Sequence, residues 1–151
     1  MSSVSSEELK KILDVVEVAL FNHSKWYEDL MRRLLCRLPL PDAVIAKDAH
    51  RQCAFGTWFY KIGETYVEDL PAFKKIGEMH RVMHENAREV SQIIKANGYA
   101  TEMEYDSFHR KLMQFRGELG NLRDKICRTL AHTDTNVQTQ EAVAKEENGL
   151  D

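Results

Sequence analysis

Residues 71–98, PAFKKIGEMHRVMHENAREVSQIIKANG, contain the clearest periodic pattern in the chain. The pattern places all its members on one side of an α-helix and is typical of helices that face a bundle core. Pro71 suits a first helical turn, and Asn97-Gly98 ends the pattern as a C-terminal cap does. Intervals of three and four residues alternate between its members, which are Phe73, Ile76, His80, Met83, Ala87, Val90 and Ile94.

The segment before this stretch predicts one long and one short helix. Residues 6–38 carry apolar side chains with helical spacing, after a capping box formed by Ser5 and Glu8. Two prolines, at positions 39 and 41, end that pattern. After a connection over residues 39–50, we expect a short helix over residues 51–62.

The segment after this stretch predicts a third long helix. A second capping box, at Thr101 and Glu104, begins an apolar pattern that continues through Leu130 and then disappears. We therefore expect residues 1–132 to form one helical domain and residues 133–151 to form a polar, flexible tail or linker. Three long helices and one short helix predict an all-α protein, an antiparallel four-helix bundle.

Composition and charge exclude several classes of protein. The 151 residues suggest one domain, and a net charge of −3 without a basic run argues against nucleic-acid binding. The N-terminus lacks a signal-peptide pattern, and the most apolar window, residues 15–21, is far shorter than the ~20 residues of a membrane span. Cys36, Cys53 and Cys127 lack the spacing of a disulfide framework. We therefore expect a soluble, cytoplasmic protein.

Three of the six histidines fall on predicted core faces. His80 belongs to the periodic pattern, and His84 follows one helical turn later on the same face. His23 lies on the core side of the first long helix. A lone core histidine is most often satisfied by a hydrogen bond. Three together favour a shared metal ion, because each unpaired ring nitrogen would cost roughly 1–3 kcal/mol.

Cys53 is the candidate for a fourth ligand. It begins the unusual sequence CAFGTW, in which a cysteine, two aromatic residues and a glycine stand together. With His23, His80 and His84 it would complete a set of one sulfur and three nitrogens, which is ordinary coordination chemistry for zinc. Such a closed set leaves no position for a water nucleophile, so we expect no catalysis at this site.

The neighbours of Cys53 have two interpretations. Trp26, Phe55 and Trp58 are core residues by type, and they can also form an apolar wall that keeps the metal dry and fixes its ligands. Gly56 costs about 1 kcal/mol relative to alanine inside a helix, which is tolerated where another segment must approach the backbone closely.

The remaining histidines and cysteines are assigned simpler roles. His50, His109 and His132 are expected at the surface, and His50 is the best substitute ligand because it lies three residues before Cys53. Cys36 and Cys127 are expected at helix ends, as structural or partly exposed thiols.

Other metal and catalytic sites fit the spacing less well. A zinc-protease helix needs Glu directly after the first histidine, where this chain has Arg81. Di-iron bundles need Glu-x-x-His, and a hemerythrin-like oxygen carrier needs His-x-x-x-Glu, neither of which occurs. The chain has neither a nucleophile elbow nor a glycine-rich phosphate loop.

Three spaced motifs resemble the bacterial chemoreceptor zinc-binding (CZB) domain family. They are His23-x-x-Trp26, Cys53-x-Phe55-Gly56-x-Trp58 and His80-x-x-x-His84. The resemblance implies zinc bound by His23, Cys53, His80 and His84 in a cytoplasmic sensor, on a chemoreceptor or a diguanylate cyclase or standing alone, and commonly a homodimer. Where the output is a cyclase, the resemblance implies that zinc represses synthesis of cyclic di-GMP. In some chemoreceptors it implies a zinc-bound cysteine that senses hypochlorous acid.

Two functions therefore remain open. The first is a zinc-responsive regulatory domain that signals to a partner or a fused output domain. The second is a redox sensor that works through oxidation of the zinc-bound Cys53. The motifs of the zinc domain lie near the N-terminus of the chain, which resembles the arrangement in the cyclases. Both a truncated sensor and a free-standing domain are consistent with this arrangement. A homodimer is further suggested by apolar residues on more than one face of the first helix: Leu13, Val15, Val18, Phe21 and Leu35.

Overall fold

The computed structural model describes residues 4–149, and every regular element in that range is helical. The prediction of an all-α fold is confirmed. Within the described range no helix is both long and apolar enough to cross a bilayer. The elements are α1 (Ser6–Leu35), α2 (Asp42–Ile45), α3 (Ala49–Gln52), α4 (Ala54–Lys61), the 3-10 helix η1 (Gly63–Tyr66), α5 (Ala72–Asn97) and α6 (Glu102–Asn148).

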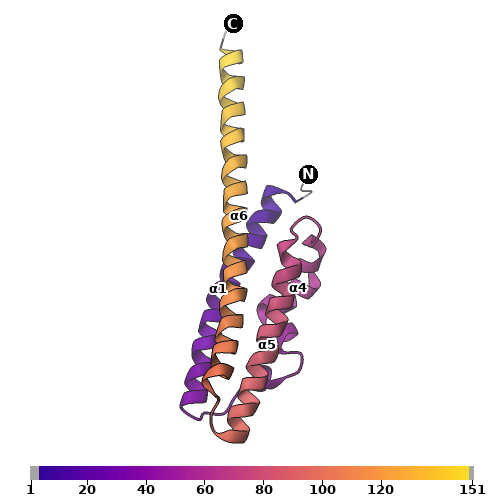
Figure 1. Ribbon diagram of the computed structural model, residues 1–151. Helices are drawn as coiled ribbons and strands as arrows, with labels where there is room; N and C mark the ends of the chain where they lie inside the picture. The colour runs from indigo at the N-terminus through magenta and orange to yellow at the C-terminus, as the bar shows by residue number, and fades with distance from the viewer. Residues whose placement is uncertain (1–3, 150–151) are drawn as a thin grey trace.

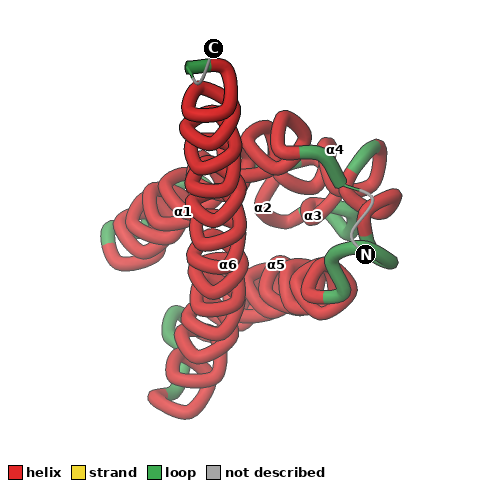
Figure 2. Tube along the Cα trace, turned by 90° about the horizontal axis from the view of Figure 1, so that it is seen from above, coloured by secondary structure: helices red, strands yellow, loops and turns green. Residues whose placement is uncertain are grey.

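Three long helices form the body of the molecule. The helix α6 contacts both α1 and α5 and runs opposite to them, and its C-terminal part extends well beyond the rest of the chain (Figure 1). The short helices α2, α3 and α4 lie together on one side of the long helices (Figure 2). Both α2 and α3 contact α5, and α4 contacts α1. The short helices therefore form a bridge between α1 and α5.

A continuous apolar core joins these elements. The stripe predicted on α5 is buried from Phe73 to Val90 and partly buried at Ile94, and the matching stripe on α6 packs against it. Each large apolar side chain removed from water contributes about 1.5–3 kcal/mol, so this core is the main source of stability. The largest fully buried side chains include Phe73, Ile76 and Met83 on α5, Phe108, Phe115 and Leu119 on α6, and Ile12 and Leu30 on α1.

The first helix ends earlier than the proline positions predict. It ends at Leu35, because Arg37 adopts a left-handed conformation with φ of 54° that turns the chain away. The Arg33 side chain then donates a hydrogen bond of 2.8 Å to the carbonyl of Pro39. The start of the helix is as predicted, with both hydrogen bonds of the Ser5–Glu8 capping box present.

The predicted short helix over residues 51–62 is in fact two helices. Cys53 interrupts it with extended backbone angles, φ −67° and ψ 159°, and separates α3 from α4. The Cys53 sulfur accepts a hydrogen bond of 3.3 Å from the Gly56 N–H and so caps α4. A Cβ on Gly56 would lie 1.7 Å from the His50 carbonyl oxygen, so only glycine fits where the two short helices meet.

The last helix does not end where the apolar pattern ends. Through residue 148 the chain remains α-helical, although its side chains after residue 133 are exposed. Loss of apolar spacing thus marks the loss of core contact, while Ala, Glu, Gln and Lys still favour the helix. The expected flexible tail is helical over residues 133–148, and its last two residues, 150–151, lie outside the described range. The domain boundary at residue 132 stays a prediction.

Candidate metal centre

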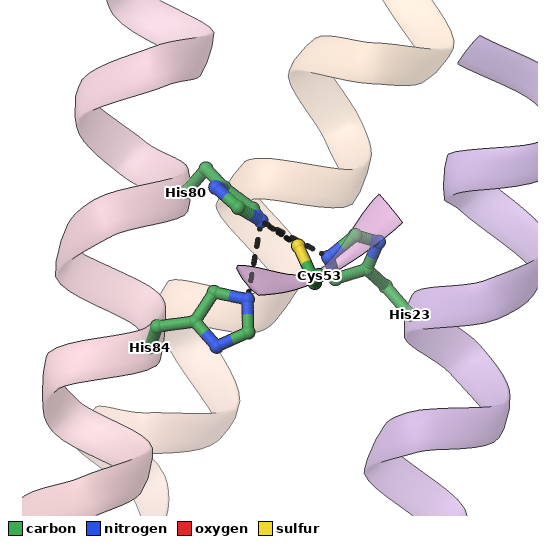
Figure 3. A group of neighbouring side chains, drawn as sticks. All are labelled: His23, Cys53, His80 and His84. Carbon is green, nitrogen blue, oxygen red and sulfur yellow. Dashed lines mark hydrogen bonds between the residues drawn. The ribbon is translucent and has the colours of Figure 1, made fainter. Parts of the chain in front are cut away.

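Four side chains from three parts of the chain meet in the core. His23 comes from α1, Cys53 from the junction of α3 and α4, and His80 and His84 from successive turns of α5. One potential ligand atom of each lies within 4.8 Å of the others (Figure 3). The structure therefore brings together the four residues that the sequence selects, although they are separated by up to 61 residues (84 − 23).

Three of the potential ligand atoms converge on the fourth, the Nε2 atom of His80. It lies 3.2 Å from Nε2 of His23, 3.1 Å from Nε2 of His84 and 3.2 Å from Sγ of Cys53. A neutral imidazole nitrogen carries either one proton or one lone pair, so it cannot satisfy three such contacts by hydrogen bonding. Zinc bonds of ~2.0–2.3 Å give a tetrahedron with edges of about 3.3–3.6 Å, close to these spacings.

A backbone hydrogen bond fixes the orientation of the His23 ring. Its Nδ1–H donates a hydrogen bond of 2.7 Å to the carbonyl oxygen of Ala19, one turn earlier on α1. That hydrogen bond sets the tautomer, so the lone pair on Nε2 points at the other three side chains. By contrast, Nδ1 of His80 is buried and finds no hydrogen-bond partner among residues 4–149.

Burial holds the three imidazoles neutral. All three are at most 5% exposed, and loss of hydration lowers the pKa of His23, His80 and His84. The pKa of His84 falls to about 3. For His80 the nearby His84 and His23 rings add to the effect of burial, because two positive charges so close together repel. Neutral imidazoles are the form that binds metal.

Cys53 has the opposite requirement, since only its thiolate binds metal well. Burial raises the pKa of the Cys53 thiol, while the Gly56 N–H bonded to the sulfur lowers it. Three neutral rings supply no positive charge that would stabilise a thiolate. A divalent cation at the centre would supply that charge. The set of one sulfur and three nitrogen atoms therefore suits a zinc ion.

Aromatic rings enclose the cluster. The Phe55 ring lies edge-on to His80 at 4.9 Å between centroids, and Trp26 lies 5.0 Å from His84. Trp58 is one ring farther out, since it packs on Phe55 and on Phe73 of the core. These rings make most of the surroundings of the potential ligand atoms apolar, which strengthens the interaction of those atoms with a cation.

Phe115 of α6 also belongs to this wall, at centroid distances of 4.9 Å from His23 and 5.1 Å from His80. Sequence analysis places Phe115 on the core stripe and gives no reason to connect it with the ligands. Its spacing is that of an ordinary core residue, so no sequence signal marks this contact.

The other histidines differ from their predicted positions in one important case. His50 is buried, with 9% exposure, and its ring packs edge-on against Tyr60, so the expectation of a surface position is wrong. His109 is half-buried, with Nδ1 3.2 Å from the Tyr27 hydroxyl. His132 is exposed, as predicted. The packing of a four-residue helix, which decides the burial of His50, has no signature in local sequence.

The two other thiols are free and exposed. Cys36 follows the last residue of α1, as predicted. Cys127 lies within α6 and not at its end, because that helix continues to Asn148.

A hollow of about 320 Å³ opens next to the cluster, between α1 and α4. Its walls are mostly apolar and include Val18, Trp26 and Trp58, and Cys53 and His84 also line it. Cys53 is only partly buried, unlike the three histidines. Cys53 is thus the most exposed of the four clustered residues.

Comparison with known proteins agrees with this geometry. The family model of the chemoreceptor zinc-binding domain matches residues 23–91, a range that contains all four clustered side chains. Residues 23–91 therefore resemble a chemoreceptor zinc-binding domain, and the metal that fits both this family and the four clustered side chains is zinc.

A curated relative extends beyond that segment. The chain is 23% identical over 112 residues to the diguanylate cyclase DgcZ of Escherichia coli (strain K12). The aligned region covers 74% of this chain and 38% of the relative, so this chain spans little more than a third of that protein's length. No solved structure matches the chain.

Proposed function

We propose that His23, Cys53, His80 and His84 bind one Zn²⁺ ion and that the chain is a zinc-responsive regulatory domain without catalytic activity. The convergence of three potential ligand atoms on the His80 nitrogen, at 3.1–3.2 Å, carries this proposal. Four protein ligands complete a tetrahedron and leave no open position, which is the mark of a structural rather than a catalytic zinc site.

The proposed response to zinc is a movement of the short helices. The four ligands tie α1 and α5 to the junction of α3 and α4. Without the ion, that junction is held mainly by the Gly56–Cys53 cap and by the packing of Phe55 and Phe59. Zinc occupancy therefore sets how firmly the bridge holds the long helices, and a partner or a fused domain reads this difference.

The output belongs to the same proposal. The matched family is named for chemoreceptors, and the curated relative is a diguanylate cyclase. We therefore infer an output of one of these two kinds, either chemotaxis or synthesis of cyclic di-GMP. The free thiols of the described chain are consistent with a cytoplasmic location.

The unit that signals is proposed to be a homodimer of antiparallel four-helix bundles, with the broken segment α2–α4 as the second helix of each. Val18 and Phe21 of α1 support this, because they are 54% and 60% exposed although both are apolar. Leu13 and Val15 instead pack against the core of the same chain. Light scattering should give twice the mass of one chain, and a monomeric mass would contradict the dimer.

The ligand set is tested by zinc binding to the metal-free protein, measured by native mass spectrometry and by competition with a chromophoric chelator. Cys53→Ala and His80→Ala should each weaken zinc binding by well over tenfold, because loss of a ligand exceeds the ~10–100-fold effect of losing a supporting residue. Cys36→Ala and His132→Ala are matched controls, since both residues are exposed and remote. Equal affinities in all four variants would show that the site is wrong.

A redox function is the second candidate, and the partial exposure of Cys53 beside the apolar hollow favours it. Hypochlorous acid reaching the sulfur would convert the thiolate to a sulfenic acid, a poorer ligand, with release of chloride. Titration with hypochlorite while zinc release is followed separates the two functions. If zinc stays bound until the whole protein is damaged, the redox function is excluded.

A further inference from the structure

His50 is a buried histidine with no part in the four-residue cluster. It lies on α3 and is 9% exposed, and its Nδ1 atom is buried without a hydrogen-bond partner among residues 4–149. An unpaired buried nitrogen costs about 1–3 kcal/mol. This unpaired nitrogen belongs to a residue only three positions before Cys53, where an additional nitrogen donor could reach the proposed metal site.

The backbone of His50 lies directly against the Cys53 turn. Its carbonyl oxygen is 4.0 Å from the Cys53 sulfur, and Gly56 lacks a side chain where that carbonyl approaches. The imidazole itself rests against Tyr60, with ring centroids 5.8 Å apart and an interplanar angle of 72°. The backbone of His50 is therefore adjacent to the sulfur, while its imidazole packs against Tyr60.

The connection between His50 and the cluster is suited to a small rearrangement. The helix α3 has four residues, and it joins α4 through the single extended residue Cys53. A change of backbone angles at Cys53 would turn α3 relative to α4, and it would require no change at His23 on α1 or at the two histidines on α5. The aromatic contact with Tyr60 is an edge contact between two rings, worth about 0.5–1.5 kcal/mol beyond burial, so it is replaceable.

Resting on the proposed zinc site, we propose that His50 is a reserve metal donor whose imidazole takes the place of the Cys53 thiolate when that sulfur cannot bind the ion. The donor set then changes from three nitrogens and one sulfur to four nitrogens. Imidazole and thiolate are both ordinary ligands of zinc-like divalent ions, but a neutral imidazole carries no negative charge to offset that of the ion. The site then binds more weakly but stays occupied.

Cobalt binding to the metal-free protein tests this proposal, because Co²⁺ reports both its geometry and its sulfur ligand by absorption. Wild type should show the intense bands of tetrahedral cobalt and a sulfur-to-cobalt charge-transfer band. Cys53→Ala should lose the charge-transfer band and keep tetrahedral intensity. Cys53→Ala combined with His50→Phe should bind cobalt at least about tenfold more weakly than Cys53→Ala alone, because a donor is lost.

The choice of His50→Phe keeps the ring that packs on Tyr60 and removes both nitrogens. Far-UV circular dichroism of the metal-free variants should show unchanged helix content. In the wild-type background, His50→Phe should leave cobalt affinity within about twofold, since Cys53 then fills the position. His132→Phe with Cys53→Ala is the matched control and should bind as Cys53→Ala does.

Three results would overturn the proposal. Equal affinity of Cys53→Ala and its combination with His50→Phe would show that His50 donates nothing. Absence of cobalt binding by Cys53→Ala would show that no reserve exists. A tenfold loss in His50→Phe alone would make His50 a permanent participant. A different result would exclude the proposed zinc site itself: equal cobalt affinity of the wild-type protein and of His80→Ala.

Discussion

At the scale of single residues, the cluster depends on imidazoles that stay neutral and on a sulfur that serves two purposes. Cys53 is both a candidate ligand and the N-terminal cap of α4, through its bond from Gly56 N–H. Any change in the charge or the position of the sulfur therefore acts on the start of that helix.

The metal-free protein should lose stability in mild acid. The pKa of His23, His80 and His84 in the folded protein lies below the ordinary value of 6.5, so between these values the unfolded chain binds more protons. The stability linked to neutral histidines is thus complete above pH 6.5 and is lost as the pH falls toward the folded values. Urea unfolding with chelator present should give a lower midpoint at pH 5 than at pH 7.5.

His84→Phe should reduce that pH dependence, whereas the exposed His132→Gln should leave it unchanged. A midpoint independent of pH over this range in the wild-type protein would mean that the three rings are not buried and neutral.

Gly56→Ala should destabilise the protein by roughly 1–3 kcal/mol, as forced overpacking does. The added Cβ would lie 1.7 Å from the His50 carbonyl, so α3 or α4 must move. Gly117→Ala on α6 is the matched control, because a Cβ there meets nothing within 4 Å. The control should be stabilised by up to about 1 kcal/mol through helix propensity, and both changes are measured by thermal unfolding. Equal effects would contradict the close contact at Gly56.

At the scale of elements, different features determine where the long helices and the short helices begin and end. The α5 helix begins and ends within a residue of the positions that Pro71 and Gly98 predict. Its pattern combines apolar periodicity with strong terminal signals. The division of residues 49–61 into α3 and α4 depends instead on the Cys53 sulfur cap and on the close approach of the His50 carbonyl to Gly56. Neither of those appears in a periodic pattern.

The part of α6 beyond residue 132 should be helical but dynamically independent of the core. Its side chains are exposed through residue 148, with Val137 and Val143 each about half exposed. Amide hydrogens of residues 133–148 should therefore exchange much faster than those of residues 108–126, because local opening disrupts no core contact there.

Removal of residues 133–151 should change the free energy of unfolding by less than about 0.5 kcal/mol and leave zinc affinity unchanged, as at other surface positions. A large loss of stability in the truncated chain would contradict the predicted domain boundary at residue 132.

At the scale of the whole molecule, zinc should act as a ligand that binds only the folded state. The ligand atoms come from residues 23, 53, 80 and 84, so the unfolded chain has no preformed site. Free zinc at 100 times its dissociation constant should stabilise the protein by about 2.7 kcal/mol, seen as a rise in melting temperature. His80→Ala should abolish this rise, and His132→Ala should keep it. A melting temperature that is insensitive to zinc would contradict folding-linked binding.

Much of this molecule follows from sequence, and the reasons differ between its parts. Helical periodicity places His80 and His84 on one face of α5 and His23 on the core face of α1, so their meeting follows from simple geometry. Burial of His50 and the contact of Phe115 with the cluster depend on how elements far apart in sequence pack together. Those contacts are long-range, and local spacing carries no record of them.

The most direct test of the whole account is the coordination shell of the zinc-loaded protein, measured by X-ray absorption at the zinc edge. The four clustered residues predict one sulfur at ~2.3 Å and three nitrogens at ~2.0–2.1 Å. In His132→Ala the shell should be unchanged, and in Cys53→Ala the sulfur should disappear. A wild-type shell without sulfur, or one completed by water oxygens, would contradict a closed site built from His23, Cys53, His80 and His84.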